Sequence, residues 1–274
     1  MEIIKNYEHK LTPEEKWEQA TLANNFIFYK VMRNHQDACK QLLEMLLGIK
    51  IESIEMKQEE TIALDYDSKG IRLDVFVKDT GRMFDVELQV ANTKELPERA
   101  RYYQGVMDVD TLKAGQKYKE LRDSHIIFIC LEDVFKNGLP VNTFANICLE
   151  DGKTKFGDRT YKHFFFAPLC AKMIEDKEVK AFFEFLISNQ ASSSYTDELK
   201  NYVADAKQST ENKMQFMTWE RQRAYDFEAG AQQKAVEDAE NMMKKNYPVD
   251  DICEITGLSL EQVLEIKEKI TVKM

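Results

Sequence analysis

The amino-acid sequence predicts an α/β fold with a C-terminal helical extension. Residues 71–90 alternate apolar and polar side chains on both sides of a glycine-containing turn, which is the pattern of a β-hairpin. Residues 13–33, 36–47 and 95–121 carry apolar side chains at helical spacing. Residues 124–131 form a continuous apolar run, as expected of a strand buried on both faces. The predicted core is therefore a helix, a three-stranded antiparallel meander, a helix and a strand.

The composition limits the class of protein. The chain has 274 residues, of which 43% are hydrophobic, enough for one sizeable domain and an appendage. Its net charge of −10 argues against a protein that coats nucleic acid without specificity, because phosphate binding needs local positive potential. The five cysteines are scattered without CxxC spacing, so we expect neither a zinc site nor a disulfide framework.

The sequence predicts neither a membrane segment nor an export signal. No apolar run approaches the roughly 18 residues that a membrane-spanning helix needs. Residues 1–6 lack the apolar core of a signal peptide. We therefore expect a cytoplasmic protein without a membrane partner.

The N-terminal helices have recognisable ends. Thr12 occupies an N-cap position, followed by proline and, three residues after the cap, by glutamate. Gly48 stands where a C-terminal cap belongs. Residues 49–56 and 61–64 then predict extended chain, and residues 65–70 predict a turn because they are rich in Asp, Ser and Gly.

The hairpin that follows has one apolar face and one polar face. The polar face carries Arg72, Asp74, Phe76 and Lys78 on the first strand, and Met83, Asp85, Glu87 and Gln89 on the second. A loop of two or four residues centred on Thr80-Gly81 places Asp74 opposite Glu87, and Arg72 opposite Gln89. A loop of three or five residues would shift this pairing.

The pairing of Asp74 with Glu87 has two interpretations. Directly opposed residues have Cβ atoms roughly 5 Å apart, and like charges at that distance are destabilising. A divalent cation between the two carboxylates would remove the repulsion. Alternatively, the acids belong to a solvated outer face, which is the common arrangement in antiparallel sheets.

The segment from residue 94 to residue 122, which contains the predicted helix over residues 95–121, is locally positive. Between residues 94 and 122, seven Lys and Arg residues stand against five Asp and Glu residues, in a chain whose net charge is −10. Its polar positions include Arg99, Arg101, Gln104 and Lys113. An ordinary mixed helix surface is the alternative interpretation of this pattern.

The C-terminal third changes character. Residues 141–150 and 160–169 predict two further strands, and residues 172–189 predict a covering helix. The chain then becomes rich in Glu, Lys, Gln and Ala. We therefore expect a domain over residues 1–190, a helical arm over 191–245 and a small tail over 246–274 that resembles a helix-turn-helix.

The last helix of the tail opens with a capping box, Ser259-Leu260-Glu261-Gln262. It carries Glu261, Glu265 and Glu268 against Lys267 and Lys269. A recognition helix should present positive and amide groups to the major groove of DNA. This charge pattern favours packing or homo-oligomerisation through the C-terminal helices.

Several segments resemble one family. Asp74, twelve residues and then Glu87-Leu88-Gln89 are similar to the D…(D/E)xK signature of the PD-(D/E)XK nuclease superfamily, with Gln89 in place of lysine. The surrounding sequence resembles that of the Rpn-type recombination-promoting nucleases, also described as PD-(D/E)XK nuclease family transposases. The matching pieces, in order, are Asn25-Phe26-Ile27-Phe28-Tyr29-Lys30, Leu42-Leu43-Glu44-Met45-Leu46-Leu47, Leu73-Asp74-Val75, Val86-Glu87-Leu88-Gln89, Arg101-Tyr102-Tyr103 and Gly115-Gln116-Lys117-Tyr118.

The resemblance implies a restriction-endonuclease-like core and a metal site. In such a site Asp74, Glu87 and the backbone carbonyl of Leu88 would bind Mg²⁺ or Mn²⁺, since hard cations prefer oxygen ligands. Gln89 can orient a water molecule, but it brings no charge. The charge of the family's lysine would then have to come from another cation, such as Arg72 or Lys113. Members of the superfamily often carry a further acid on the first helix, where this chain has Asn25.

Three functions follow as hypotheses. The first is a metal-dependent DNA endonuclease connected with recombination or mobile elements. In it Asp74, Glu87 and Gln89 are catalytic, Arg99, Arg101, Gln104 and Lys113 bind DNA, and Asn25, Arg72 and Asp85 are accessory. The second is an inactive descendant that binds nucleic acid or a protein. The third is an interaction protein whose acidic face is only solvated.

Overall fold

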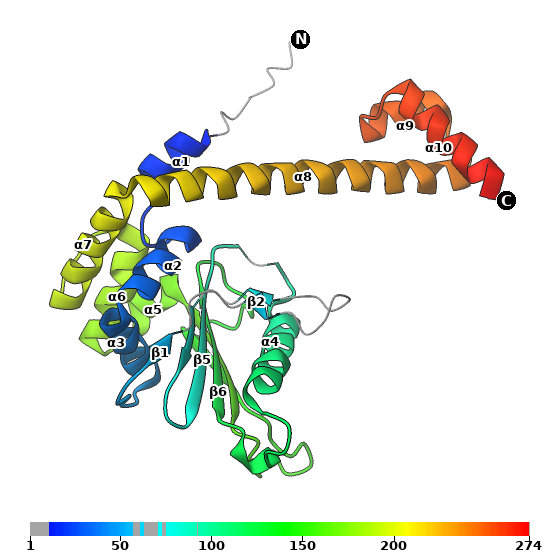
Figure 1. Ribbon diagram of the computed structural model, residues 1–274. Helices are drawn as coiled ribbons and strands as arrows, with labels where there is room; N and C mark the ends of the chain where they lie inside the picture. The colour runs from blue at the N-terminus through cyan, green and yellow to red at the C-terminus, as the bar shows by residue number, and fades with distance from the viewer. Residues whose placement is uncertain (1–10, 57–60, 63–70, 73–74, 92, 274) are drawn as a thin grey trace. The chain divides into compact units, whose positions relative to one another are not determined.

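The computed structural model describes residues 11–56, 61–62, 71–72, 75–91 and 93–273 (Figure 1). These residues form two compact units. The first extends from Glu18 to Thr210, and the second combines the chain before Glu18 with the chain after Thr210.

A six-stranded mixed sheet is the centre of the first unit. Its spatial order is β1-β4-β5-β6-β8-β7. The strands are β1 (Glu55–Met56), β4 (Val75–Lys78), β5 (Arg82–Gln89), β6 (Asp123–Cys130), β7 (Val141–Phe144) and β8 (Thr160–Phe166). Strands β1, β4 and β5 pair antiparallel, β5, β6 and β8 pair parallel, and β7 is antiparallel to β8. A separate antiparallel pair joins β2 (Thr61–Ile62) to β3 (Ile71–Arg72).

This sheet confirms the predicted mixed α/β class. In the hairpin, Val75 pairs with Val86 and Lys78 pairs with Met83, which is the register expected from a two-residue loop. The Asp79 N–H donates to the Arg82 carbonyl at 3.0 Å and closes that loop. The full three-stranded meander stays a prediction, because the chain between β1 and β4 is described only in part.

Helices cover both faces of the sheet (Figure 1). One face carries α4 (Leu96–Thr111) and the other carries α2 (Asn25–Asn34), α3 (Gln36–Leu47), α5 (Ala167–Met173), α6 (Lys177–Ser188) and α7 (Ser194–Gln208). On the second face, the rings of Phe165 in β8 and Phe183 in α6 stack at 5.9 Å. The Tyr195 hydroxyl of α7 donates to the Ala38 carbonyl of α3 at 2.9 Å, so α7 is attached to the first unit.

The core beneath α4 joins the helix to four strands. Its buried members are Phe76, Met83, Leu96, Ala100, Val106, Met107, Ile126, Phe128, Cys130 and Phe164. Residues 126, 128 and 130 of β6 lie in this cluster, whereas 127 and 129 belong to the opposite face, as the two-residue period of a strand requires. The continuous apolar run of β6 is therefore buried on both sides.

Two predicted helices are shorter in the structure. The helix expected over residues 13–33 is broken between α1 (Pro13–Gln19) and α2, because the Asn24 side chain caps α2 by accepting hydrogen bonds from the N–H groups of Phe26 and Ile27. The helix expected over residues 95–121 ends at Thr111.

The chain after α4 turns away from the core. Gly115 has a φ of 89°, and a right-handed helix cannot continue through a residue with this backbone angle. A short 3₁₀ helix (Tyr118–Glu120) follows, and Tyr118 is 85% exposed although it belongs to the segment with apolar side chains at helical spacing.

The second unit is helical. It contains most of α1, α8 (Thr210–Lys244), α9 (Val249–Thr256) and α10 (Leu260–Lys273). A small core joins the end of α8 to α9 and α10 through Ala239, Ile252, Leu258, Val263 and Ile266. The predicted capping box is present: the Ser259 N–H donates to Gln262 Oε1 at 2.9 Å, and the Gln262 N–H donates to Ser259 Oγ at 3.2 Å. Among the described helices, none is both long and apolar enough to cross a membrane.

Candidate active site

The carboxylate of Glu87 lies buried between β5 and α4. Its side chain is only 4% exposed. Nη2 of Arg99, on the first turn of α4, lies 3.0 Å from Glu87 Oε2. Nη1 of the same guanidinium donates to Gln89 Oε1 at 2.8 Å. One cation therefore bridges the two residues of the Glu-Leu-Gln segment whose side chains share a face of β5.

Aromatic side chains hold the Arg99 guanidinium in place. The Tyr103 hydroxyl accepts a hydrogen bond from Nη2 at 3.1 Å. The guanidinium carbon lies 5.3 Å from the Tyr103 ring centre and 5.5 Å from that of Phe128. Arg99 and Tyr103 are four residues apart, so they project from the same side of α4. The side chain of Arg99 is nevertheless 28% exposed and remains within reach of solvent.

The charged residues of the site shift the pKa of Tyr103. Burial raises the pKa of its hydroxyl, and the negative charge of Glu87 raises it further, whereas Arg99 acts in the opposite direction. The group is therefore protonated at neutral pH and can both donate and accept hydrogen bonds. Asp85 adds to the same effect, which places its charge close to the site.

Asp85 is fully buried. It pairs in the sheet with Phe76 and Ile126, both of which lie in the core beneath α4. The alternative of a merely solvated acidic face is therefore wrong for Glu87 and Asp85. The sequence could not show this, because alternation tells which side chains share a face but not whether a helix covers it.

The backbone carbonyl of Leu88 points away from β6. The Asp123 N–H donates to the Gly81 carbonyl, and the Leu131 N–H donates to the Gln89 carbonyl, at 2.9 and 3.0 Å. Successive carbonyls of a strand point to opposite edges, so the carbonyl of Leu88 is directed toward the β4 side.

Oxygen donors dominate this part of the site. Glu87 provides a carboxylate, Gln89 an amide oxygen and Leu88 a backbone carbonyl. Hard cations such as Mg²⁺ and Mn²⁺ prefer such ligands, so the donor chemistry fits them. Within the part of the chain that is described, no group of three or more His, Cys, Asp or Glu residues is arranged to hold a metal ion. Asp74 lies outside the described residues, and Arg72 is described only by its backbone in β3.

The other predicted residues have the following surroundings. Arg101 is exposed on α4 and, two residues after Arg99, points about 200° away around the helix. Gln104 is buried, and its Nε2 lies 3.4 Å from Asp108 Oδ1. Lys113 follows α4, where its Nζ donates to the Asp110 carbonyl at 2.8 Å. Asn25 begins α2 and its side chain makes no hydrogen bond within the described structure.

Two residues of the site were missed by pattern reasoning. Tyr103 lies in the segment with apolar side chains at helical spacing and Phe128 in the continuous apolar run, yet both contact Arg99. The four-residue spacing of Arg99 and Tyr103 was the available signal. The contact with Phe128 could not be foreseen, because it depends on how α4 lies over β6.

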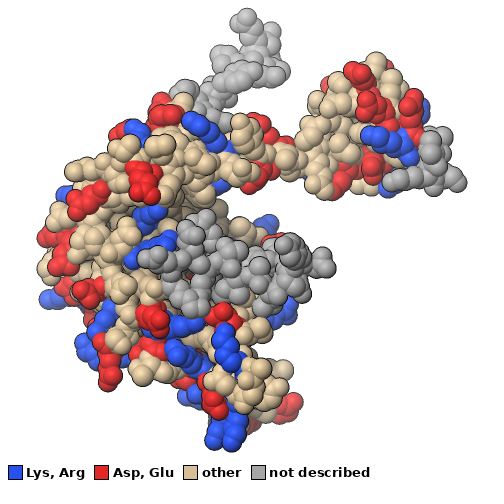
Figure 2. Space-filling model, in the orientation of Figure 1, with Lys and Arg blue, Asp and Glu red and all other residues tan. Residues whose placement is uncertain are grey.

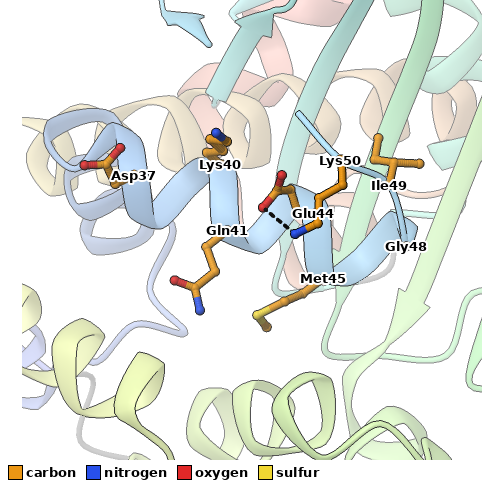
Figure 3. A pocket seen from close by; sticks show the side chains of 8 residues that line it. All are labelled: Asp37, Lys40, Gln41, Glu44, Met45, Gly48, Ile49 and Lys50. Atoms are coloured by element: carbon orange, nitrogen blue, oxygen red, sulfur yellow. Dashed lines mark ion pairs between the residues drawn. The ribbon is translucent and has the colours of Figure 1, made fainter. Parts of the chain in front are cut away.

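Two cavities lie elsewhere on the first unit. A cavity of about 660 Å³ is formed by Asp37, Lys40, Gln41, Glu44, Met45, Gly48, Ile49 and Lys50 (Figure 3). Its main polar contacts are local, since Glu44 accepts the Ile51 N–H at 2.8 Å and lies 3.9 Å from Lys50 Nζ. A second cavity of about 370 Å³ is lined by Lys119, Arg122 and Arg159 among others, and these arginines already bind backbone carbonyls. Neither cavity is lined by Glu87, Gln89 or Arg99.

The charges on the visible face are mixed in sign. On the side of the molecule that Figure 2 shows, Lys and Arg side chains alternate with Asp and Glu side chains. The site around Glu87 is therefore distinguished by its buried ion pair and its donors rather than by a basic surface.

Three comparisons with known proteins gave one match. The family model described as PD-(D/E)XK nuclease family transposase matches residues 23–246. Neither the curated proteins nor the solved structures gave a match. The match includes the whole sheet, α4 and the Glu87-Leu88-Gln89 segment. The chain belongs to the PD-(D/E)XK nuclease family transposases.

Proposed function

We propose that this protein is a metal-dependent DNA endonuclease that hydrolyses phosphodiester bonds and serves recombination or a mobile element. The observation that carries the proposal is the buried Glu87 carboxylate, fixed beside Gln89 by Arg99, in a chain of a nuclease family. A buried carboxylate is costly unless it is compensated, and functional sites are where such groups concentrate.

The residues have distinct proposed roles. Asp74, Glu87 and the Leu88 carbonyl would hold Mg²⁺ or Mn²⁺. When bound, the ion would supply Lewis-acid chemistry, making a water molecule more acidic and offsetting charge on the phosphodiester. Gln89 would orient the attacking water by hydrogen bonding. The hairpin supports this assignment, because the pairing of Val75 with Val86 has the register from which the sequence places Asp74 opposite Glu87.

The proposed partner is DNA. Arg101 and Lys113 are exposed and would contact phosphates outside the site. Because each such contact releases counterions from the DNA, we expect this binding to weaken as the salt concentration rises. Homo-oligomerisation through the C-terminal helices and a cytoplasmic location remain part of the proposal.

A catalytically inactive binding module is the second candidate. Arg99 already compensates Glu87, and Gln89 is neutral, so the same contacts could stabilise a nuclease scaffold that no longer cleaves. This candidate predicts association with nucleic acid or with a protein, without metal-dependent cleavage.

Cleavage of supercoiled plasmid in the presence of Mg²⁺ or Mn²⁺ tests the proposal. Glu87→Gln should abolish nicking, because the amide loses the negative charge that a cation needs. Glu220→Gln is a matched control: Glu220 is also 4% exposed and pairs with Lys16 and Arg223, but it lies in the second unit. It should nick at the wild-type rate.

The outcomes separate the candidates. Nicking by wild type and Glu220→Gln but not by Glu87→Gln supports the endonuclease. Equal nicking by all three proteins contradicts the assignment of Glu87 to the active site. No nicking by any of them, together with retained DNA binding, favours the inactive module.

A further inference from the structure

The candidate site needs a positive charge that Gln89 does not provide. Hydrolysis of a phosphodiester places additional negative charge on the phosphoryl oxygens in the transition state. Asp85 and Glu87 bring further negative charge close to the same place. A cation fixed beside Gln89 would stabilise the transition-state charge and offset the charge of the nearby carboxylates.

We propose that Arg99 is the catalytic cation of this site, contacting the scissile phosphate from α4. This inference rests on the proposed endonuclease function and extends it, since it names the residue that replaces the missing charge at position 89. Among the side chains described, Arg99 is the one whose guanidinium contacts both Gln89 and Glu87, at 2.8 and 3.0 Å.

The chemistry of the guanidinium suits this role. It stays charged at any physiological pH, and its planar array of donors matches the oxygens of a phosphate. Arg99 is bound to Tyr103 and lies over Phe128, so little conformational freedom is lost when a phosphate binds. Its 28% exposure leaves a route for the substrate.

The reaction itself is a hydrolysis without electron transfer. The oxygen of water forms a bond to phosphorus, one phosphorus–oxygen ester bond breaks, and the departing oxygen receives a proton. Arg99 neither gives nor takes that proton, because it cannot deprotonate in this range. It stabilises the charge on the non-bridging oxygens while those bonds change.

The same contacts predict competition between Arg99 and the metal ion. Both are attracted to the carboxylate of Glu87, and like charges a few ångströms apart repel strongly. Removing the charge of Arg99 should therefore tighten cation binding while it slows cleavage. A residue that only supports the fold would weaken both together.

Arg99→Gln is the central variant, since it keeps hydrogen-bonding capacity and removes the charge. We expect cleavage of plasmid to fall by roughly 10²–10³-fold, the usual effect of removing a group that stabilises transition-state charge. Arg99→Lys should retain part of the activity. Gln89→Lys in the Arg99→Gln background should restore at least about tenfold, because it returns a cation to the neighbouring position.

Arg223→Gln is the matched control. Arg223 also pairs with a buried carboxylate, that of Glu220, and lies over an aromatic ring, that of Trp219. It belongs to the second unit, and the variant should cleave at the wild-type rate. Melting temperatures of all variants show which of them fold.

Calorimetric titration with Mn²⁺ alone gives a reading that is independent of activity. Arg99→Gln should bind Mn²⁺ about tenfold more tightly than wild type, because a like charge near the site has been removed. Glu87→Gln should lose the binding. Tighter binding with slower cleavage and rescue by Gln89→Lys supports the role of Arg99.

Other results overturn it. Wild-type cleavage by Arg99→Gln, absence of rescue, or weaker Mn²⁺ binding in a folded Arg99→Gln protein each excludes Arg99 as the catalytic cation while leaving the endonuclease intact. If wild type itself does not cleave, the proposed function fails and the role of Arg99 in catalysis falls with it.

Discussion

At the scale of single residues, the pair of Glu87 and Arg99 is stable only as a pair. Removing one partner of a buried ion pair leaves an uncompensated charge and costs about 3–5 kcal/mol. Arg99 is partly exposed, so we expect Arg99→Gln to lower the free energy of unfolding by an amount at or below the lower end of that range.

The double variant Glu87→Gln/Arg99→Gln should be more stable than Arg99→Gln alone. Two neutral amides at these positions no longer bury an unpaired carboxylate, which recovers about 1 kcal/mol or more. Urea denaturation of the wild type, both single variants and the double variant measures this coupling. Additive losses would show that the two side chains do not interact energetically.

The sequence indicated the common face of Glu87 and Gln89, but not the cation that both contact. Alternation placed Glu87 and Gln89 on one face, and in the structure both contact Arg99, which was not foreseen. Arg99 itself was grouped with Arg101 and Lys113 by charge alone, whereas the structure separates them around and beyond α4. Charge composition cannot tell which lysine or arginine finds a buried partner, because that depends on how helix and sheet pack.

At the scale of elements, the interiors of helices and strands were predictable but their ends were less so. The central strands β5 and β6 follow from alternation and from a continuous apolar run. The break at Asn24 and the end of α4 at Thr111 depend on capping and on the backbone at Gly115, which compete locally with helical periodicity.

The second face of the sheet carries a pair of histidines on adjacent strands. His125 Nδ1 lies 3.1 Å from His163 Nε2, and His163 Nδ1 lies 3.1 Å from Thr143 Oγ1. Burial lowers the pKa of each histidine to about 4, with a smaller contribution from Arg82 at His125 and from His125 at His163. Both are therefore neutral in the folded protein at pH 7.

These lowered pKa values predict a loss of stability in acid. Between about pH 4 and 6.5 the unfolded chain binds more protons than the folded one, so the free energy of unfolding falls as the pH falls through that window. Above pH 6.5 the two histidines no longer lower the stability. His125→Phe keeps a ring between Phe84 and Tyr161 and should reduce this dependence. Urea denaturation at pH 7.5 and pH 4.5 measures it. An unchanged difference between the two pH values would contradict the assignment.

At the scale of the whole molecule, the contacts group residues 18–210 in one unit and the chain on either side of them in a second. The arm expected from residue 191 begins with α7, whose Tyr195 is buried in the first unit and bonded to Ala38. Sequence character changes at this point because the surface of the helices becomes polar. Surface composition does not reveal which unit a helix packs against, so the three-part division remains a prediction.

The small core of α8, α9 and α10 should unfold independently of the sheet. Ile252 and Val263 are fully buried there, and their cluster contains side chains of the second unit alone. Ile252→Ala should cost about 2–5 kcal/mol locally, as for other large-to-small changes in cores. Hydrogen exchange followed by mass spectrometry should then show faster exchange in α9 and α10, with β5 and β6 unchanged. Ile255→Ala, at an exposed position of α9, is the control. Faster exchange in both units would mean instead that the chain unfolds as one cooperative body, and the C-terminal helices would then contribute directly to the stability of the site.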